Sequence, residues 1–200
     1  MVRTEREQKK NSEMSGTLER SVSMEFRAVE GEERTVELSF SSEIAVERWW
    51  GPEILDHSDG CVDMSRLTDM GCVLFNHNRN IVVAKVEKAW IESNRGKAKI
   101  RFDEDDESEK IYQKVKSGTL RGVSTGYRVS NWETVQQGKK SLDGRFKGPC
   151  NIAKRWMPYE ISIVSIPADA TVGVGRSMDE VNGRTFDYYS RQLQINKRRI

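Results

Sequence analysis

The sequence is poor in the residues that mark covalently or metal-stabilised folds: its 200 residues include two histidines and three cysteines. Cys61, Cys72 and Cys150 are odd in number and form no C-x-x-C pair, which favours reduced thiols over a disulfide framework or a zinc site. No apolar run approaches the roughly 20 residues of a membrane helix, and the N-terminus has no apolar signal region. These absences predict a soluble, intracellular protein without a membrane partner.

Charge of either sign is not in excess. The 33 Lys and Arg residues nearly balance 31 Asp and Glu, and the two kinds are interspersed, which argues against a nucleic-acid-binding surface. Charged residues still make up 32% of the chain, which is polar for a compact domain, so we expect solvated ends. The pattern predicts a flexible charged arm at residues 1–20, a folded domain at 21–176, and a basic tail, helical or disordered, at 177–200.

Alternation of apolar and polar residues predicts β-strands along the middle of the chain. Residues 23–29 and 35–41 alternate with the period of half-buried strands, and a turn at 30–33 indicates a hairpin. Further short strands are expected at residues 72–75, 81–86, 97–102 and 156–167. Residues 49–52 and the polar segment 76–80 are expected to lie in loops.

One helix is expected, at residues 107–117. Asp105 or Asp106 can cap its N-terminus, an apolar stripe follows one face, and Gly118 can end it. Short strands at regular spacing with one or two helices are typical of a closed or nearly closed barrel. We therefore predict a mixed, β-rich (α+β) fold: a β-barrel flanked by a few short helices.

One motif is typical of a catalytic serine, the G-x-S-x-G of residues 122–126. In α/β-hydrolases this serine follows a strand and precedes a helix, and the catalytic histidine comes later in the chain. Here a predicted helix precedes Ser124 and no histidine lies downstream, so that class is excluded. Two interpretations stay open: a nucleophile beside backbone N–H groups that hold an oxyanion, or a serine in a tight turn whose glycines provide a positive φ or close chain packing.

The two histidines are the candidates for a general base. His77 follows the predicted strand 72–75 in a polar loop, where a side chain can be held rigidly and still reach solvent. His57 lies between Asp56 and Asp59 and is expected to be a charged residue of a surface loop. A solvated or structural role is the alternative for each. No H-E-x-x-H motif is present, so we expect no metal and no cofactor.

Several segments together resemble the prohead (procapsid) maturation proteases of tailed phages, over about residues 34–176. The resemblance rests on ELSFSSEIAVERWWGPEILDHS, LFNHN, LRGVSTGYRV and WMPYEISIVSIPADATVGVGR, of which the last three are specific in this order and spacing. That family is similar in turn to the herpesvirus assemblins, serine proteases on a β-barrel flanked by helices. The resemblance implies an assemblin-like barrel here, with His77 of LFNHN as the base and Ser124 of GVSTGY as the nucleophile.

The resemblance also suggests a third member of the triad. Assemblins have a second histidine after the serine; this sequence has none there, and the matching position in YEISIVS is Glu160. A carboxylate that orients an imidazole is common in Ser-His-acid triads. Asp169 is the rival candidate. The assemblin arginine pair near the oxyanion has no match, and Arg176 is either its substitute or a surface charge.

The function implied by the resemblance is that of a serine endopeptidase without a cofactor. Its expected substrates are the scaffolding segment of the major capsid protein precursor and the protease itself, by autocleavage, inside the assembling prohead in the host cytoplasm. The assemblin relatives also suggest a homodimer, and no nucleic-acid or membrane partner is expected. A different class stays open: a non-catalytic scaffold or capsid-assembly module on the same barrel, with His77 and Ser124 in separate hydrogen bonds.

Overall fold

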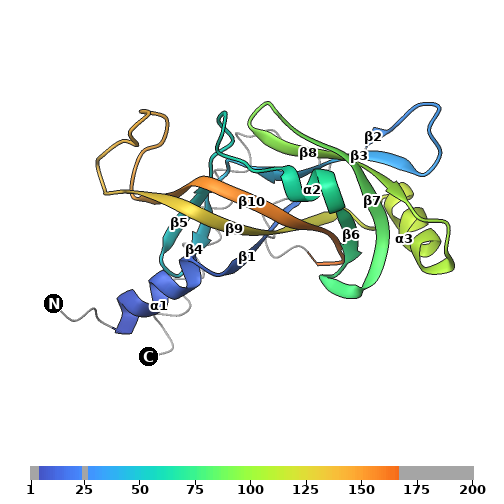
Figure 1. Ribbon diagram of the computed structural model, residues 1–200, viewed down its shortest axis with the longest axis horizontal. Helices are drawn as coiled ribbons and strands as arrows, with labels where there is room; N and C mark the ends of the chain where they lie inside the picture. Colours follow the sequence, from blue (N-terminus) through green and yellow to red (C-terminus); the bar gives the residue numbers. More distant parts are fainter. Residues whose placement is uncertain (1–4, 24–26, 167–200) are drawn as a thin grey trace, which may run out of the picture. The chain divides into compact units, whose positions relative to one another are not determined.

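The computed structural model describes residues 5–23 and 27–166 (Figure 1). The helices in this part of the chain are α1 Glu5–Met14, α2 Ser65–Met70 and α3 Asp106–Lys116. The strands are β1 Thr17–Ser23, β2 Arg27–Ala28, β3 Thr35–Ser42, β4 Val46–Arg48, β5 Gly51–Leu55, β6 Cys72–Phe75, β7 Asn78–Glu92, β8 Arg95–Phe102, β9 Gly122–Val135 and β10 Cys150–Val164. Among the described residues, no helix is both long and apolar enough to cross a membrane.

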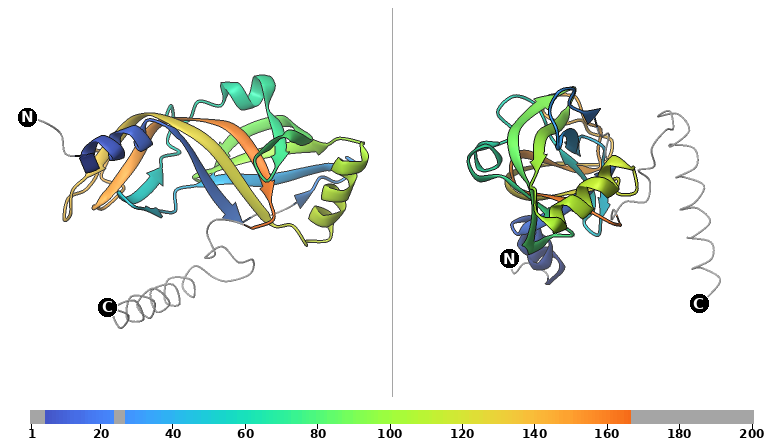
Figure 2. Two further views of the ribbon diagram at one scale, coloured as in Figure 1. Left: turned by 90° about the horizontal axis from the view of Figure 1, so that it is seen from below. Right: turned by 90° about the vertical axis from the view of Figure 1, so that its right-hand side faces the viewer.

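The strands form one curled sheet. Its order is β1-β9-β10-β6-β7-β8-β3-β2, and β5 pairs with β10 and carries β4 on its other side. β10 runs antiparallel to β9 but parallel to β5 and β6. The two ends of the order, β1 and β2, are successive in the chain, and β1 contacts β3, so the sheet curls back toward itself (Figure 2). The predicted fold class, a β-rich barrel-like sheet with a few short helices, is confirmed.

The inner face of the curled sheet carries the main hydrophobic core. Inward-pointing residues of the long strands, among them Leu38, Ile100, Tyr127 and Trp156, are at most 2% exposed. Because alternate residues of a strand point to opposite faces, the other half of each strand is free to carry polar groups outward. Burying one side chain of this size stabilises the fold by about 1.5–3 kcal/mol. The core therefore makes β9 and β10 a rigid base for the side chains on their outer face.

Helix α3 has the predicted capping signals at both ends. The Asp105 carboxylate accepts hydrogen bonds from the backbone N–H groups of Glu107 and Ser108, each at 3.0 Å. Such a cap is worth about 1 kcal/mol. Gly118 follows the helix with a φ of 73°, a conformation that favours glycine. The helix packs on β7 and β8 and leads the chain into β9, as predicted.

Two local predictions were wrong in part, and one helix was not predicted. Trp49 and Trp50 form a turn, as expected, but Gly51 and Pro52 already belong to β5. The expected loop at 76–80 is shorter, since β7 already begins at Asn78. Helix α2 was not predicted: it has six residues and buries only Leu67, too little for a periodic apolar pattern.

The sequence predicted a flexible charged arm at residues 1–20. In the structure, part of this segment forms helix α1 and strand β1. Helix α1 is attached through Trp132, whose indole N–H donates to the Met14 carbonyl at 2.9 Å. Strand β1 pairs antiparallel with β9, from Thr17 opposite Arg128 to Ser23 opposite Gly122. The basic tail predicted at 177–200 lies outside the described residues, and the division of the chain into domains stays a prediction.

His57 is a buried core residue, and not the charged surface residue that the sequence predicted. It is 4% exposed, and its ring lies between the Leu55 carbonyl, 2.9 Å from Nδ1, and the Ser41 hydroxyl, 2.8 Å from Nε2. Because a carbonyl can only accept, Nδ1 carries the proton and Nε2 accepts from Ser41. Burial lowers the pKa of His57 to about 4, although the bond to Leu55 opposes this. His57 is therefore neutral at pH 7 and structural.

Candidate active site

Ser124 lies within strand β9, not on a turn. It pairs with Ser21 of β1 on one side and Ser162 of β10 on the other. Gly126 owes its place to close packing, because a Cβ there would come within 2.6 Å of the Tyr159 ring. The expected tight turn is therefore absent, whereas the close packing that the same interpretation offered for the glycines is present at Gly126. Since alternate strand residues share a face, Ser124 and Gly126 lie together on the outer face of β9.

His77 is part of a two-residue turn between β6 and β7. Phe75 pairs with Asn78, and the intervening Asn76 and His77 have φ values of 51° and 58°. Histidine in this left-handed conformation costs about 1–2 kcal/mol, since glycine and asparagine are the residues that adopt it readily. The turn is tied to β10 by a bond from the Asn76 N–H to the Ile163 carbonyl at 2.9 Å. A strained residue held by its surroundings is typical of a functional site.

Glu160 and Ser162 of β10 contact His77. Glu160 Oε1 lies 2.5 Å from His77 Nδ1, and the Ser162 hydroxyl donates to the same oxygen at 2.8 Å. Ser162 Oγ also accepts from the His77 backbone N–H at 3.2 Å. A bulge in β10 just before Glu160 sets the register that places Ser162 opposite Ser124. The carboxylate holds the proton on Nδ1 and leaves Nε2 as the basic nitrogen.

Ser124 and His77 line one pocket of about 310 Å³. Each of them contacts β1: the Ser124 hydroxyl donates to the Arg20 carbonyl at 3.3 Å, and His77 Nε2 lies 3.7 Å from the Glu19 carboxylate. Ser124 is only 1% exposed. The structure thus brings the predicted base and nucleophile to the same pocket, with each group bonded to a neighbour and not to the other.

Strand pairing surrounds the backbone near Ser124. β1 and β10 pair with β9 across this position, so the N–H groups expected to hold an oxyanion lie within a sheet that is paired on both sides. In this conformation they are not open to a substrate carbonyl. Release of β1 would expose one edge of β9 next to the serine.

Arg48 holds β1 against the core beside this pocket. Its guanidinium donates to the Glu19 carbonyl at 2.7 Å and to the Tyr127 hydroxyl at 3.0 Å. The carboxylate of Glu53, which is fully buried, accepts from Tyr127 and pairs with Arg48 Nε at 3.3 Å. Burial and the neighbouring Glu53 raise the pKa of Tyr127 far above its ordinary value. The buried network therefore fixes the strand that contacts both Ser124 and His77.

Two sequence candidates fall outside the described residues. Asp169, the rival of Glu160, and Arg176, the suggested oxyanion residue, both lie beyond position 166. Within the described part of the chain, no group of histidine, cysteine and carboxylate side chains could hold a metal ion. The three cysteines are free thiols.

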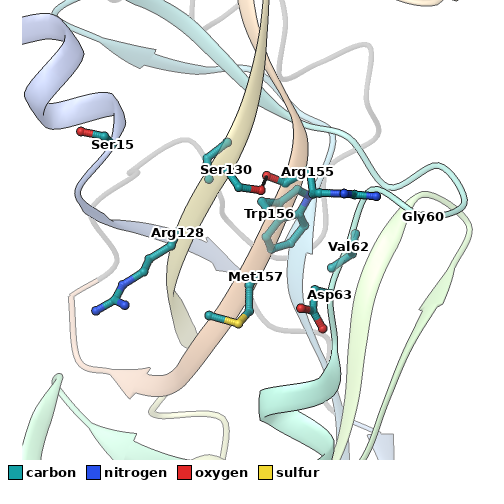
Figure 3. A pocket seen from close by; sticks show the side chains of 10 residues that line it. Ser15, Gly60, Val62, Asp63, Arg128, Ser130, Arg155, Trp156 and Met157 are labelled. Atoms are coloured by element: carbon teal, nitrogen blue, oxygen red, sulfur yellow. Dashed lines mark hydrogen bonds between the residues drawn. The ribbon is translucent and has the colours of Figure 1, made fainter.

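A larger pocket, of about 590 Å³, lies further along β9 (Figure 3). Arg128 lines it and shares the outer face with Ser124, because the two are four residues apart on one strand. Figure 3 shows Arg128 and Arg155 pointing in different directions. No histidine lines this pocket, so we assign it no catalytic role.

Two residues of the site were not predicted from the sequence. Ser162 follows Glu160 by two positions, and the period of a strand puts both on one face, so the alternation in YEISIVS was a usable signal. Glu19 gave no signal, because it lies in a charged segment without apolar alternation. Its proximity to His77 depends on the pairing of β1 with β9.

Comparison with known proteins places the sequence in a family. The family described as caudovirus prohead serine protease matches residues 57–184, more than half of the chain. The chain belongs to this family. The predicted resemblance to the tailed-phage prohead proteases is confirmed.

One curated protein and one solved structure are similar to this prohead protease family member. The major capsid protein of Halomonas phage phiHAP-1 is 39% identical over 147 residues, which are 72% of this chain and 23% of that protein. The chain therefore spans only a minor part of that relative's length. Among solved structures, the capsid assembly protease gp21 of bacteriophage T4 is similar with a TM-score of 0.44 and 12% identity, over 76% of this chain and 98% of that one.

Proposed function

We propose that this prohead protease family member is an active serine endopeptidase in which Ser124 is the nucleophile, His77 the general base and Glu160 the third member of the triad. The observation that carries the proposal is the position of His77. Its ring is 2.5 Å from the Glu160 carboxylate and lines the same pocket as Ser124. A nucleophile, a base and a group that orients the base are thereby gathered in one place.

The proposed chemistry is hydrolysis through an acyl-enzyme. Glu160 keeps the proton on His77 Nδ1, so that Nε2 takes the Ser124 proton as Oγ attacks the scissile carbonyl. The imidazolium then gives this proton to the leaving amine, and water releases the acyl group in a second step with the same base. Glu160 stabilises the imidazolium in both steps. No metal or cofactor takes part.

Catalysis requires a rearrangement at β1. The Ser124 hydroxyl must turn from the Arg20 carbonyl toward His77 Nε2, and the Glu19 carboxylate must leave that nitrogen. Catalytic hydrogen bonds are often long or misaligned before substrate binds, so the present geometry suits a resting state. Movement of β1 would also free backbone N–H groups of β9 for the oxyanion.

The proposed substrates are the scaffolding segment of the major capsid protein precursor and the protease itself. Membership of the prohead protease family supports this, as does the relative from phage phiHAP-1. There, a segment similar to this chain is part of a longer polypeptide named major capsid protein. The reaction would take place inside the assembling prohead in the host cytoplasm, and a homodimer remains a prediction.

A second candidate function rests on the separate hydrogen bonds of Ser124 and His77 and on the burial of Ser124. A non-catalytic capsid-assembly module would keep these bonds permanently. It would use the barrel for packing alone. The two functions differ in whether peptide bonds are cut.

The test is to follow intact masses of the chain alone and with its cognate capsid precursor, for the wild type, Ser124→Ala and Ser130→Ala. Ser130 is a matched control, because it lies exposed on the same face of β9 and bonds only to the Arg155 carbonyl at 3.2 Å. We expect discrete fragments from the wild type and Ser130→Ala and none from Ser124→Ala. Unchanged masses in all three, with folded protein and assembled precursor, would favour the non-catalytic module.

A further inference from the structure

We propose that Ser162 is a positioning residue of this site: its hydroxyl joins the carboxylate of Glu160 to the backbone of His77 and thereby fixes the acid against the base. The inference rests on the proposed function in its roles for His77 and Glu160. It adds a fourth residue, whose hydroxyl bonds to Glu160 and to His77 and not to the nucleophile.

The Ser162 hydroxyl acts both as a donor and as an acceptor of hydrogen bonds within the site. It donates its proton to Glu160 Oε1 at 2.8 Å and accepts the His77 backbone N–H at 3.2 Å. The same carboxylate oxygen contacts His77 Nδ1 at 2.5 Å, so the hydroxyl and the imidazole meet at one oxygen atom. Ser162 is fully buried, which excludes water as a competitor for these bonds.

Each of the two partners needs such a restraint. The Glu160 side chain has three rotatable bonds, and its carboxylate can orient the imidazole only if it stays on the His77 side. His77 is strained, with a φ of 58°. The bond between its N–H and Ser162 holds this backbone in place. The Ser162 hydroxyl thus holds the Glu160 carboxylate through one bond and the His77 backbone through the other, and together these bonds fix the distance between the carboxylate and the ring.

Ser162 is not a second nucleophile. Although it lies opposite Ser124 on the neighbouring strand, its proton is directed at the carboxylate and not at His77 Nε2. It is also absent from the residues that line the pocket, whereas Ser124 is among them. Its effect on catalysis must therefore pass through His77 and Glu160.

The test uses the full chain as Ser162→Ala, Ser162→Thr and Ser130→Ala, with cleavage of the capsid precursor as the activity. We expect Ser162→Ala to lower kcat about 10- to 100-fold with little change in KM, since loss of positioning acts on the chemical step. Ser162→Thr retains a hydroxyl and should recover most of kcat, and Ser130→Ala should match the wild type. If Ser162→Ala does not fold, Ser162→Cys, of similar volume but with a weak donor, takes its place.

A spectroscopic readout separates positioning from a general structural role. The proton on His77 Nδ1 should give a far-downfield NMR resonance because of its short bond to Glu160. In Ser162→Ala this resonance should move upfield or vanish, while the folded spectrum is otherwise retained. Ser162→Thr should restore it.

Two outcomes would overturn the inference: a kcat of Ser162→Ala within about twofold of the wild type with an unchanged Nδ1 resonance, or a raised KM at constant kcat. The NMR measurement needs no turnover, so it tests the role of Ser162 even in an inactive protein. A failure of the proposed function would be seen in the cleavage assay instead, as cleavage that persists in Ser124→Ala or that is absent from the wild type.

Discussion

Acid should destabilise this protein through His57, by an amount that follows from its surroundings. Burial beside the Leu55 carbonyl and the Ser41 hydroxyl lowers the pKa of His57 to about 4, against an ordinary value near 6.5. His57 therefore binds a proton below about pH 6.5 in the unfolded chain, but only below about pH 4 in the folded chain. Stability from this residue is complete above pH 6.5 and is lost as the pH falls toward 4. At 1.36 kcal/mol per pKa unit, the loss is about 3 kcal/mol.

The assay is urea unfolding followed by tryptophan fluorescence, at intervals between pH 7.5 and 4.5, for the wild type and His57→Gln. The variant will be less stable at pH 7 because it loses packing against Trp156, whose ring lies 5.3 Å away. The difference between the two pH profiles is what reports His57. We expect the wild type to lose about 2–3 kcal/mol more than the variant over this range.

Direct titration provides the control. The sequence has only two histidines, so the ring resonances of His57 can be assigned by NMR from the variant alone. We expect a midpoint near pH 4. A midpoint near 6.5, or parallel stability profiles for the wild type and His57→Gln, would refute the reasoning that burial keeps this residue neutral.

Three further predictions concern neighbouring groups. Glu19→Gln should change the cleavage rate by at most about fivefold, because its exposed carboxylate lies 3.7 Å from His77 Nε2 and interacts with it only weakly; a tenfold fall would instead make Glu19 part of the active machinery. Lys154→Met should lower the free energy of unfolding by about 1.5–3 kcal/mol in urea titrations, since it removes one of the two cationic partners of the buried Asp56 and leaves Arg145. Lys85→Met, at an exposed pair, should change it by under about 0.5 kcal/mol. Gly96→Ala should cost about 1–3 kcal/mol in the same assay, because its Cβ would lie 2.3 Å from Ser41 Oγ and 2.6 Å from the buried Phe40 ring; unchanged stability would contradict this packing.

The elements predicted well from the sequence are those whose pattern is local. Helix α3 has its cap at Asp105, its acids and its terminal Gly118 within one short segment, and its predicted bounds differ from the observed ones by one residue. Strands β6 and β8 alternate or run apolar in the way that buried strands do. In these segments the chain's own periodicity and the tertiary structure favour the same conformation.

The predictions that failed depended on contacts with distant segments. β1 is charged and has little apolar alternation, yet it pairs along β9 because Leu18 and the Arg20 side chain are buried inside the sheet. His57 stands between acidic residues, which suggested solvent, but the Asp56 beside it is buried and paired with Lys154 and Arg145. The sequence around Asp56 contains no local signal that Arg145, about 90 residues away, pairs with it.

The candidate site lies between these cases. His77 and Ser124 were selected by residue type and by family resemblance, and Glu160 by its place in YEISIVS. The sequence did not suggest that β1 contacts the first two, because that depends on strand order. The glycines of the G-x-S-x-G motif suggested a turn or close packing, and only the close packing, of Gly126 against the Tyr159 ring, is observed.

The central claim is that Ser124 is a nucleophile activated by His77. The most direct measurement is labelling of the full chain with a fluorophosphonate, which reacts covalently with activated serines, followed by peptide mass spectrometry. The account predicts a label on Ser124 in the wild type and in Ser130→Ala, and none in Ser124→Ala or His77→Ala. A label on Ser162, or cleavage of the capsid precursor that continues in Ser124→Ala, would contradict it.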